Sequence, residues 1–328
     1  MGLTVAVTGP TGQIGISAVS ALESDAGVER IIGMARRPFD PTAHGWTKTV
    51  YRQGDILDRD AVDALVADAD VVVHLAFIIF GSRDESSHVN LEGARNVFEA
   101  TVQAARPRRL VYTSSVAAYG YHPDNPSPIT EDVPTRGTPE HYYSEQKAAL
   151  EKALAEITAG SDLEVYVLRP CIVAGPKARA LADALPWSHG PGLLRTAVRA
   201  VMVVPDPGVP LQLVHHDDVA AAIALAVTTS APPGAYNIAA DGVVTVSDVV
   251  TAFGGHAVRV PHVAATAASA LLGHLPFVPA LAEWLHTMRA PAVMDTAKAR
   301  TLLGWTPAFT TSQTLEALAR SSDDAGAQ

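Results

Sequence analysis

A tyrosine and a lysine lie four residues apart in the segment HYYSEQKAALEKAL, at Tyr143 and Lys147. In a helix this spacing places both side chains on one face, one turn apart. A phenol ordinarily titrates near pH about 10, and a neighbouring ammonium group is expected to lower that pKa toward neutrality. The pair is therefore suited to proton transfer to or from an oxygen atom. The same spacing also occurs on ordinary solvent-facing helices.

A second candidate group stands at the end of the strand-like segment RLVYTSS, where Ser115 precedes a turn at Gly120. A hydroxyl at the carboxyl end of a strand lies where open α/β sheets bind their ligands. We expect Ser115 to hydrogen-bond the reacting oxygen. The alternative is that this serine only caps the turn, as serines often do.

Three glycines, spaced three residues apart, follow a run of β-branched residues in VAVTGPTGQIG. In a strand-to-helix turn such glycines allow the tight bend, the approach of a pyrophosphate and the close packing of helix on strand. The free N–H groups and the dipole at the start of the helix then attract the anion. The pattern predicts a dinucleotide site whose phosphate loop is made of Gly9, Thr11, Gly12, Gln13, Ile14 and Gly15.

The residues after the second predicted strand bear on the choice of dinucleotide. A carboxylate at this position would bind the adenosine ribose of NAD, but the sequence has Ala35, followed by Arg36 and Arg37. A guanidinium group binds a 2′-phosphate well, so NADP(H) is favoured and NAD(H) stays possible. Asp55 and Ile56, after the third strand, are expected beside the adenine, although Asp55 is also a common turn residue.

The elements that would position these groups alternate along the first half of the chain. Short apolar runs predict strands in the segments 3–9, 29–35, 49–55, 70–76, 109–115 and 164–170, and helical periodicity appears at 13–23, 59–67, 85–105 and 142–159. This order is typical of βαβ units. We therefore predict an α/β protein with a Rossmann-type, doubly wound parallel sheet.

After Pro170, prolines and glycines break the chain into short pieces. We expect residues 1–170, with later contributions from about 211–238, to form the dinucleotide-binding domain. Residues 171–210 and 239–328 are expected to form a smaller, mixed substrate-binding lobe. The apolar segment 263–285 contains two prolines, a histidine and a glutamate, and is expected to be a buried or pocket-lining helix rather than a membrane span.

Composition narrows the class of partner. The chain has 328 residues, 48% of them hydrophobic, and a formal net charge of −10, which gives no basic surface for nucleic acid. Cys171 is the single cysteine, and no basic leader followed by an apolar stretch precedes the first strand. We expect a cytoplasmic protein with a small-molecule substrate and no nucleic-acid or membrane partner.

The glycine loop, the strand-end serine and the later Tyr-x-x-x-Lys together resemble the short-chain dehydrogenase/reductase superfamily. VTGPTGQIG, TSSVAAYG and YSEQK are similar to patterns of its extended branch, the NAD-dependent epimerase/dehydratase-like family, and further segments as far as KARTLLGWTP extend the resemblance over nearly the whole chain. The resemblance implies that Ser115, Tyr143 and Lys147 are catalytic. It also implies that Tyr143, Lys147, Leu75 and Ala76 contact the cofactor, and that the protein is a homodimer.

Departures from the family pattern point to the substrate. Nucleotide-sugar members have an asparagine and an arginine near the substrate diphosphate, where this chain has Ile172 and Leu211. Sugar dehydratases carry an Asp-Glu pair where this chain has Val116 and Ala117. The resemblance therefore implies an apolar pocket, and the expected substrate-binding residues are Phe77, Ile78, Phe80, Ser115 and Ile172.

The function expected from these residues is NADP(H)-dependent interconversion of a carbonyl and a secondary alcohol on a fairly apolar small molecule, with Tyr143 as the proton donor. One alternative is a nucleotide-sugar 4-epimerase or reductase that binds its diphosphate through Arg179, Arg195 or Arg199. Two others are a redox-sensing regulator without catalysis and a peripheral membrane partner using residues 263–285.

Two histidines precede two aspartates in LVHHDDVA, at positions 215 to 218. Neighbouring residues of a strand point to opposite faces, so the four side chains are not expected to converge on a metal. We predict instead a strand that ends at the acidic start of a helix, and no metal site.

Overall fold

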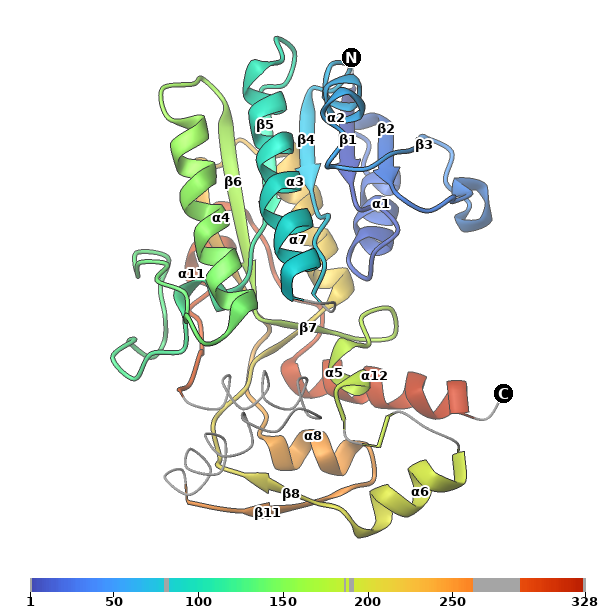
Figure 1. The fold of residues 1–328 in the computed structure, drawn as a ribbon, viewed down its shortest axis with the longest axis vertical. Helices are drawn as coiled ribbons and strands as arrows, with labels where there is room; N and C mark the ends of the chain where they lie inside the picture. Colours follow the sequence, from blue (N-terminus) through green and yellow to red (C-terminus); the bar gives the residue numbers. More distant parts are fainter. Residues whose placement is uncertain (1, 80–82, 186, 189–191, 262–289, 327–328) are drawn as a thin grey trace.

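The computed structural model describes residues 2–79, 83–185, 187–188, 192–261 and 290–326. Its largest element is a seven-stranded sheet in the order β10-β6-β5-β4-β1-β2-β3, with every neighbouring pair parallel (Figure 1). The strands are β1 (Leu3–Thr8), β2 (Val28–Ala35), β3 (Thr49–Gln53), β4 (Val71–His74), β5 (Arg109–Thr113), β6 (Glu164–Pro170) and β10 (Gly234–Ile238). The predicted doubly wound parallel sheet is confirmed.

Helices cover both faces of this sheet. Side chains of α1 (Gly15–Ser24) and α7 (His216–Thr228) pack on one face, and those of α2 (Arg59–Val66), α3 (Arg83–Gln103) and α4 (Tyr142–Thr158) pack on the other. Within β1, Val5 and Val7 join the first cluster, while Ala6 between them joins the second. Burial on both faces explains why the strands are continuous apolar runs in the sequence.

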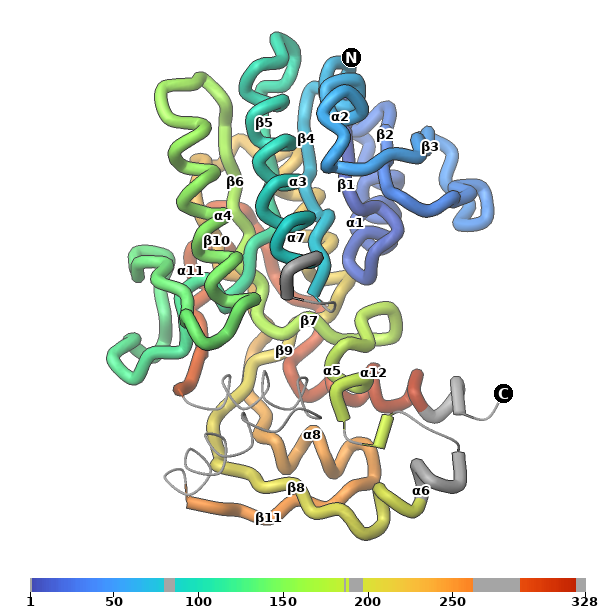
Figure 2. The backbone as a smooth tube through the Cα atoms, viewed as in Figure 1, coloured from blue at the N-terminus to red at the C-terminus, as the bar shows by residue number. Residues whose placement is uncertain are grey.

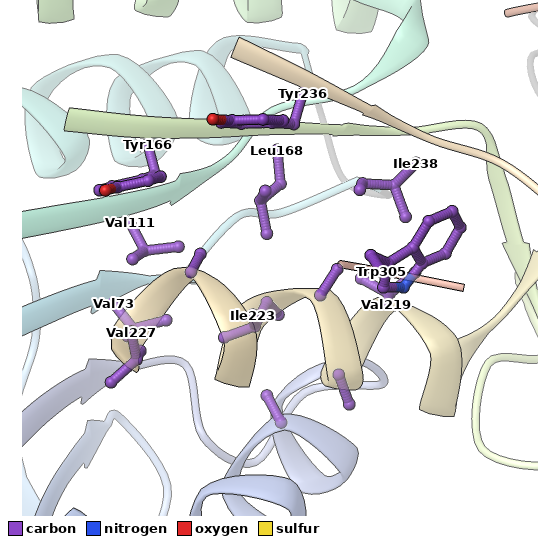
Figure 3. Close-up of a cluster of buried hydrophobic side chains, with 14 of the residues drawn as sticks. Val73, Val111, Tyr166, Leu168, Val219, Ile223, Val227, Tyr236, Ile238 and Trp305 are labelled. Carbon is purple, nitrogen blue, oxygen red and sulfur yellow. The ribbon is translucent and has the colours of Figure 1, made fainter. Parts of the chain in front are cut away.

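The core on the α7 face is drawn in Figure 3. Val219, Ile223 and Val227 repeat every four residues along α7 and point toward the strands, where Val111 and Leu168 lie. Small residues between them, such as those of the run VAAAIALAV, let the helix lie close to the sheet. This face therefore depends on a helix that comes after the first six strands of the sheet in the sequence.

Trp305 completes the same core, although it lies in the range expected to form the substrate lobe. Its side chain is fully buried in this core (Figure 3). Its indole N–H donates to the Asp218 carbonyl oxygen at 2.9 Å. The Asp218 carboxylate accepts from the backbone N–H groups of Ala308 and Phe309, at 2.7 and 3.2 Å. The expectation that all of 239–328 belongs to the lobe is thus wrong around Trp305, because this contact joins residues 87 apart.

The smaller lobe lies beyond the carboxyl ends of the strands (Figure 2). Two parallel pairs, β7 with β9 and β8 with β11, are packed with short helices around a separate cluster that includes Trp187, Leu211 and Val249. The elements are β7 (Ile172–Ala174), β8 (Val203–Asp206), β9 (Leu213–His215), β11 (His256–Arg259), α5 (Ala180–Asp183), α6 (Gly192–Val201), α8 (Val246–Ala252) and α12 (Thr311–Gly326).

Three more short helices connect the elements just described. They are η1 (Pro41–His44), after β2, η2 (Val116–Tyr119), after β5, and α11 (Ala297–Leu302), which contacts β10. The helix expected at 263–285 lies outside the described residues. In the described ranges, no helix combines the length and apolarity needed to cross a membrane.

We predict that Trp305→Ala lowers the free energy of unfolding by about 3–5 kcal/mol, because it removes a fully buried indole from the sheet core. Urea unfolding followed by circular dichroism measures the loss. Leu302→Ala is the matched control, since that side chain is 45% exposed nearby on α11 and should cost less than about 1 kcal/mol. Equal losses for the two variants would contradict a core role for Trp305.

Candidate active site

The predicted phosphate loop connects β1 to α1. Gly9 has a φ of +73°, and a Cβ there would lie 2.8 Å from the backbone nitrogen of Ala76. A Cβ on Gly15 would lie 2.1 Å from the Gly9 carbonyl oxygen, so the helix can begin this close to the loop only at a glycine. Thr11 is half-buried, and Gly12 and Gln13 are exposed.

The first turn of α1 is open to an anion. Ile14 occupies the N-cap position, makes no side-chain capping hydrogen bond, and no acidic residue follows in the first turn. The N–H groups at such a helix end, together with the dipole, favour a phosphate group. The geometry of this loop therefore fits the pyrophosphate of a dinucleotide.

Side chains of β3 hold the backbone of the loop that follows β2. The Tyr51 hydroxyl donates to the carbonyl oxygens of Ala35 and Arg37, and the Gln53 amide donates to the Arg36 carbonyl oxygen at 2.9 Å. Both arginine side chains are exposed, and neither forms an ion pair within the described ranges. Their guanidinium groups are thus available to a ligand while their backbone is fixed.

The other residues expected beside the cofactor lie along the same edge of the sheet. One carboxylate oxygen of Asp55 accepts from the Leu57 N–H at 3.1 Å, which is the turn role that was the alternative for this residue. Ile56 is buried, and its carbonyl oxygen accepts from Asn96 at 3.0 Å. Leu75 and Ala76 are half-buried, and their N–H groups face Thr8 at the end of β1.

The structure brings Ser115 and Tyr143 together. Ser115 follows β5 in an extended conformation, is 7% exposed, and its hydroxyl accepts from the Ala117 N–H at 3.1 Å. A side-chain hydrogen bond also links it to Tyr143, in the first turn of α4. The serine therefore caps the turn and contacts the tyrosine at once, so the two roles weighed for it do not exclude each other.

Lys147 follows one helical turn later and is 3% exposed. Its Nζ donates to the Thr113 carbonyl oxygen at 3.0 Å and lies 3.9 Å from the centre of the Phe77 ring. The distance from Nζ to the centre of the Tyr143 ring is 5.9 Å. The predicted face shared by the tyrosine and the lysine is present, with the ammonium directed at the strand end and Phe77.

The pKa shift expected for Tyr143 is wrong in direction. Removal from water raises the pKa of the phenol, a second contribution from Tyr142 acts the same way, and the hydrogen bond from Ser115 opposes them. Burial also lowers the pKa of Lys147 to about 7, against the effect of Glu151. Spacing alone predicts the proximity of the two groups, but the desolvation of both decides their titration.

An apolar pocket adjoins Ser115. It is lined by Val116, Tyr121, Cys171, Ile172, Pro210, Leu211, Gln212 and Ala292, and none of these lining residues is charged. The Gln212 amide is engaged at both ends by the backbone of Met294. The structure thus brings together Ile172 and Leu211, the two positions at which the sequence lacks a phosphate-binding side chain.

Other residues expected near the substrate have varied positions. The Phe77 ring packs edge-on against the Tyr143 ring, with 5.4 Å between centres. The Ile78 N–H donates to the Asn90 side chain at 2.8 Å. Phe80 lies outside the described residues. Phe77 is therefore part of the same constellation as the tyrosine and the lysine, although it does not line the apolar pocket.

The arginines considered for a diphosphate do not line this pocket. Arg179 donates to the Ser321 carbonyl oxygen at 3.2 Å, and Arg199 lies beside the Phe253 carbonyl oxygen at 3.5 Å. The side chain of Arg195 lies outside the described ranges. The two described arginines are engaged by other elements of the lobe.

The LVHHDDVA segment forms β9 followed by the acidic start of α7, as predicted. Contrary to the expectation that the side chains diverge, His215, His216 and Asp217 place donor atoms within 4.8 Å of one another, because the helix begins between the histidines. The Nδ1 atoms of both histidines have partners, while the buried Nε2 of His216 has none among the described residues. His216 Nδ1 contacts Ser17 Oγ and Asp217 at 2.9 Å, and His215 Nδ1 accepts from the Asp217 N–H.

Comparison with known proteins bears on the family. A family model described as the NAD dependent epimerase/dehydratase family matches residues 5–239. An uncharacterised protein of Mycobacterium bovis is 27% identical over 250 residues, which cover 74% of this chain and 63% of that protein. Human 3 beta-hydroxysteroid dehydrogenase type 7 is 32% identical over 198 residues, 55% of this chain and 53% of that one. The chain thus spans less than two thirds of these relatives.

A solved structure agrees with the fold. MoeE5 in complex with UDP-glucuronic acid and NAD superposes with a TM-score of 0.73 at 22% identity, over 98% of this chain and 99% of that chain. At this level of identity the likeness shows the fold alone. It matches the parallel sheet and the lobe at its carboxyl edge together.

We predict that Gly15→Ala destabilises the cofactor-free protein by about 1–3 kcal/mol, because its methyl group would overlap backbone atoms of Gly9 and Pro10. Urea unfolding measures this loss. Gly12→Ala is the control in the same loop, since its nearest contact is 3.4 Å away, and it should cost less than about 1 kcal/mol. A Gly15 variant as stable as the wild type would show that the loop has room for a side chain.

Proposed function

Because the chain belongs to the NAD dependent epimerase/dehydratase family, we propose that it is an NADP(H)-dependent oxidoreductase that interconverts a carbonyl and a secondary alcohol on a fairly apolar small molecule. The observation that carries this proposal is the group formed by Ser115, Tyr143 and Lys147 at the carboxyl edge of the sheet. This edge also carries the open start of α1.

Each of the three side chains has a role in the proposed reaction. The nicotinamide, when bound, supplies or accepts the hydride. In the direction of reduction, the Tyr143 hydroxyl gives its proton to the carbonyl oxygen, which becomes the alcohol oxygen, and Ser115 holds that oxygen by a hydrogen bond. The raised pKa of Tyr143 keeps the phenol in its protonated form. Lys147 holds the cofactor ribose and favours the phenolate that forms.

The pocket beside Ser115 supports an apolar substrate. Its uncharged lining includes Ile172 and Leu211, and the polar ends of Gln212 are occupied by the backbone. A diphosphate placed there would lose its hydration without gaining a charged partner from these residues. The resemblance to a human 3 beta-hydroxysteroid dehydrogenase is consistent with an alcohol or ketone on a hydrocarbon frame.

The preference for NADP(H) rests on Arg36 and Arg37. No carboxylate stands at the end of β2 to bind a free ribose or to repel a phosphate, since Ala35 occupies that position. The exposed guanidinium groups can form charge-assisted hydrogen bonds with a 2′-phosphate. NAD(H) remains usable in this proposal, with weaker binding.

The second candidate is a nucleotide-sugar 4-epimerase or reductase. It is favoured by the similarity of the whole chain to MoeE5, which is solved with UDP-glucuronic acid and NAD. The uncharged pocket and the engagement of Arg179 and Arg199 within the lobe weigh against it. A regulator without catalysis would not need the Tyr143 and Lys147 pair, so this candidate ranks below both.

The expected homodimer stays a prediction, which light scattering after size-exclusion chromatography tests.

A panel of apolar ketones and UDP- or dTDP-sugars tests the proposed reaction, with NADPH absorbance and product analysis as readouts. We expect NADPH absorbance to fall with the ketones, and product analysis to show that the sugars are not converted. Tyr143→Phe should lower kcat at least about 100-fold and leave NADPH affinity within about 3-fold, because it removes only the transferred proton and its hydrogen bond. Tyr166→Phe is the control, which should keep activity, because its hydroxyl donates to the Ala231 carbonyl oxygen away from the site. Epimerised sugar without net absorbance change would favour the second candidate.

We predict that Arg36→Ala raises KM for NADPH by about 10- to 100-fold and changes KM for NADH less than about 3-fold, because only the former carries the 2′-phosphate. Steady-state kinetics with both cofactors measures the difference. Arg30→Ala is a matched control, as this exposed arginine lies on the same strand away from its carboxyl end. Equal losses for the two cofactors would refute the assignment of Arg36.

A further inference from the structure

An ion pair lies buried behind Lys147, between α4 and β6. Glu151 and Arg169 have side chains that are 7% and 9% exposed. The guanidinium grips the carboxylate from two nitrogens, with Nη2 at 2.6 Å from Oε2 and Nε at 3.0 Å from Oε1. Removing both charges from water is costly, so a buried pair of this kind is not by itself a source of stability. Its place next to the proposed catalytic residues suggests a role in the site.

The pair is connected to the strand end that carries the serine. Ser114 donates to Glu151 Oε1 at 2.5 Å, and Lys147 donates to the Thr113 carbonyl oxygen at 3.0 Å. Ser115, which contacts Tyr143, directly follows Thr113 and Ser114 in the chain. One side chain and one backbone contact from α4 therefore fix successive residues just before the proposed catalytic serine.

Arg169 ties the pair to the rest of the domain. Its Nη1 donates to the Tyr119 hydroxyl at 2.8 Å, and that hydroxyl donates to Asn237 on β10 at 2.7 Å. The guanidinium thus holds the Glu151 carboxylate in one orientation through two hydrogen bonds.

The groups that face Lys147 come from three elements. On α4 they are Tyr143 and Glu151, on β4 His74, and on β5 Tyr112. Burial, with a contribution from Lys147, lowers the pKa of His74 to about 3, and burial raises the pKa of Tyr112 well above its ordinary value. Both are therefore uncharged near neutral pH, which leaves Glu151 as the negative charge among these described neighbours.

We propose that Glu151, held by Arg169, is a positioning residue that keeps Lys147 protonated in its buried site. The proposal rests on the proposed function, because the charge of Lys147 matters to turnover only if that lysine serves the tyrosine and the cofactor. The charge itself is measurable without any turnover. The geometry on α4 places the two charges near each other, since residues 147 and 151 are one helical turn apart and bind successive residues of the same strand end.

The test is the titration of Lys147 in the full chain by NMR of ¹³C- and ¹⁵N-labelled lysine. The chain has five lysines, and Lys147→Met identifies the signal of interest. We expect Glu151→Gln to lower the Lys147 pKa by about 1, because a nearby opposite charge has been removed. From a wild-type pKa of about 7 the protonated fraction at pH 7 would fall from about one half to about one tenth.

Two further variants separate charge from packing. Glu151→Asp keeps the charge and should leave the Lys147 pKa close to that of the wild type. Glu151→Gln combined with Arg169→Met avoids an unpaired buried guanidinium and serves if the single variant fails to fold. It should lower the Lys147 pKa by less than the single variant would, because a positive charge is removed together with the negative one. Glu156→Gln is the matched control, because this exposed carboxylate lies on the same helix and pairs with Lys152.

A Lys147 pKa that stays unchanged in Glu151→Gln and in the double variant would overturn the proposal, and so would an equal fall in Glu151→Asp. Absence of turnover with every ketone and sugar is a different failure. It would refute the proposed function, while the titration would still decide the role of Glu151. With an active enzyme, the pH at which kcat/KM reaches half its maximum should move with the Lys147 pKa.

Discussion

Parallel pairing of all seven strands is the constraint on which the site depends. It places the carboxyl ends of β1, β4 and β5 at one edge, where the glycine loop, Phe77 and Ser115 follow them. Groups more than a hundred residues apart in the chain thus share a site without a dedicated contact between them. The cost is that both faces of the sheet must be covered, and α7 with Trp305 completes one of those faces.

Local patterns predicted most of this framework. The ends of the six predicted strands differ by at most two residues from those in the structure, because their apolar runs are bounded by turns and helix starts. The convergence of Ser115, Tyr143 and Lys147 also follows from local facts. A strand end and an i, i+4 pair on a helix are both visible in a short window of sequence.

Two of the misplaced expectations depend on the folded chain rather than on local pattern. Trp305 joins the sheet core through Asp218, and the direction of the Tyr143 pKa shift follows from how deeply the site is buried. No local pattern in the sequence indicates the pair of Glu151 and Arg169. Glu151 stands four residues after Lys147, but only the folded sheet brings Arg169 of β6 to this carboxylate. Contacts such as these cannot be predicted from a short stretch of sequence, because the two partners are far apart in the chain.

The place of Trp305 also bears on how the chain is made. During synthesis the amino-terminal strands leave the ribosome first, and domains generally begin to fold as they emerge. In this protein the surface beneath α7 is closed by the side chain of Trp305, and β10 at the sheet edge also follows the other six strands in the sequence. The nascent sheet therefore keeps part of one apolar face uncovered until residue 305 has left the ribosome.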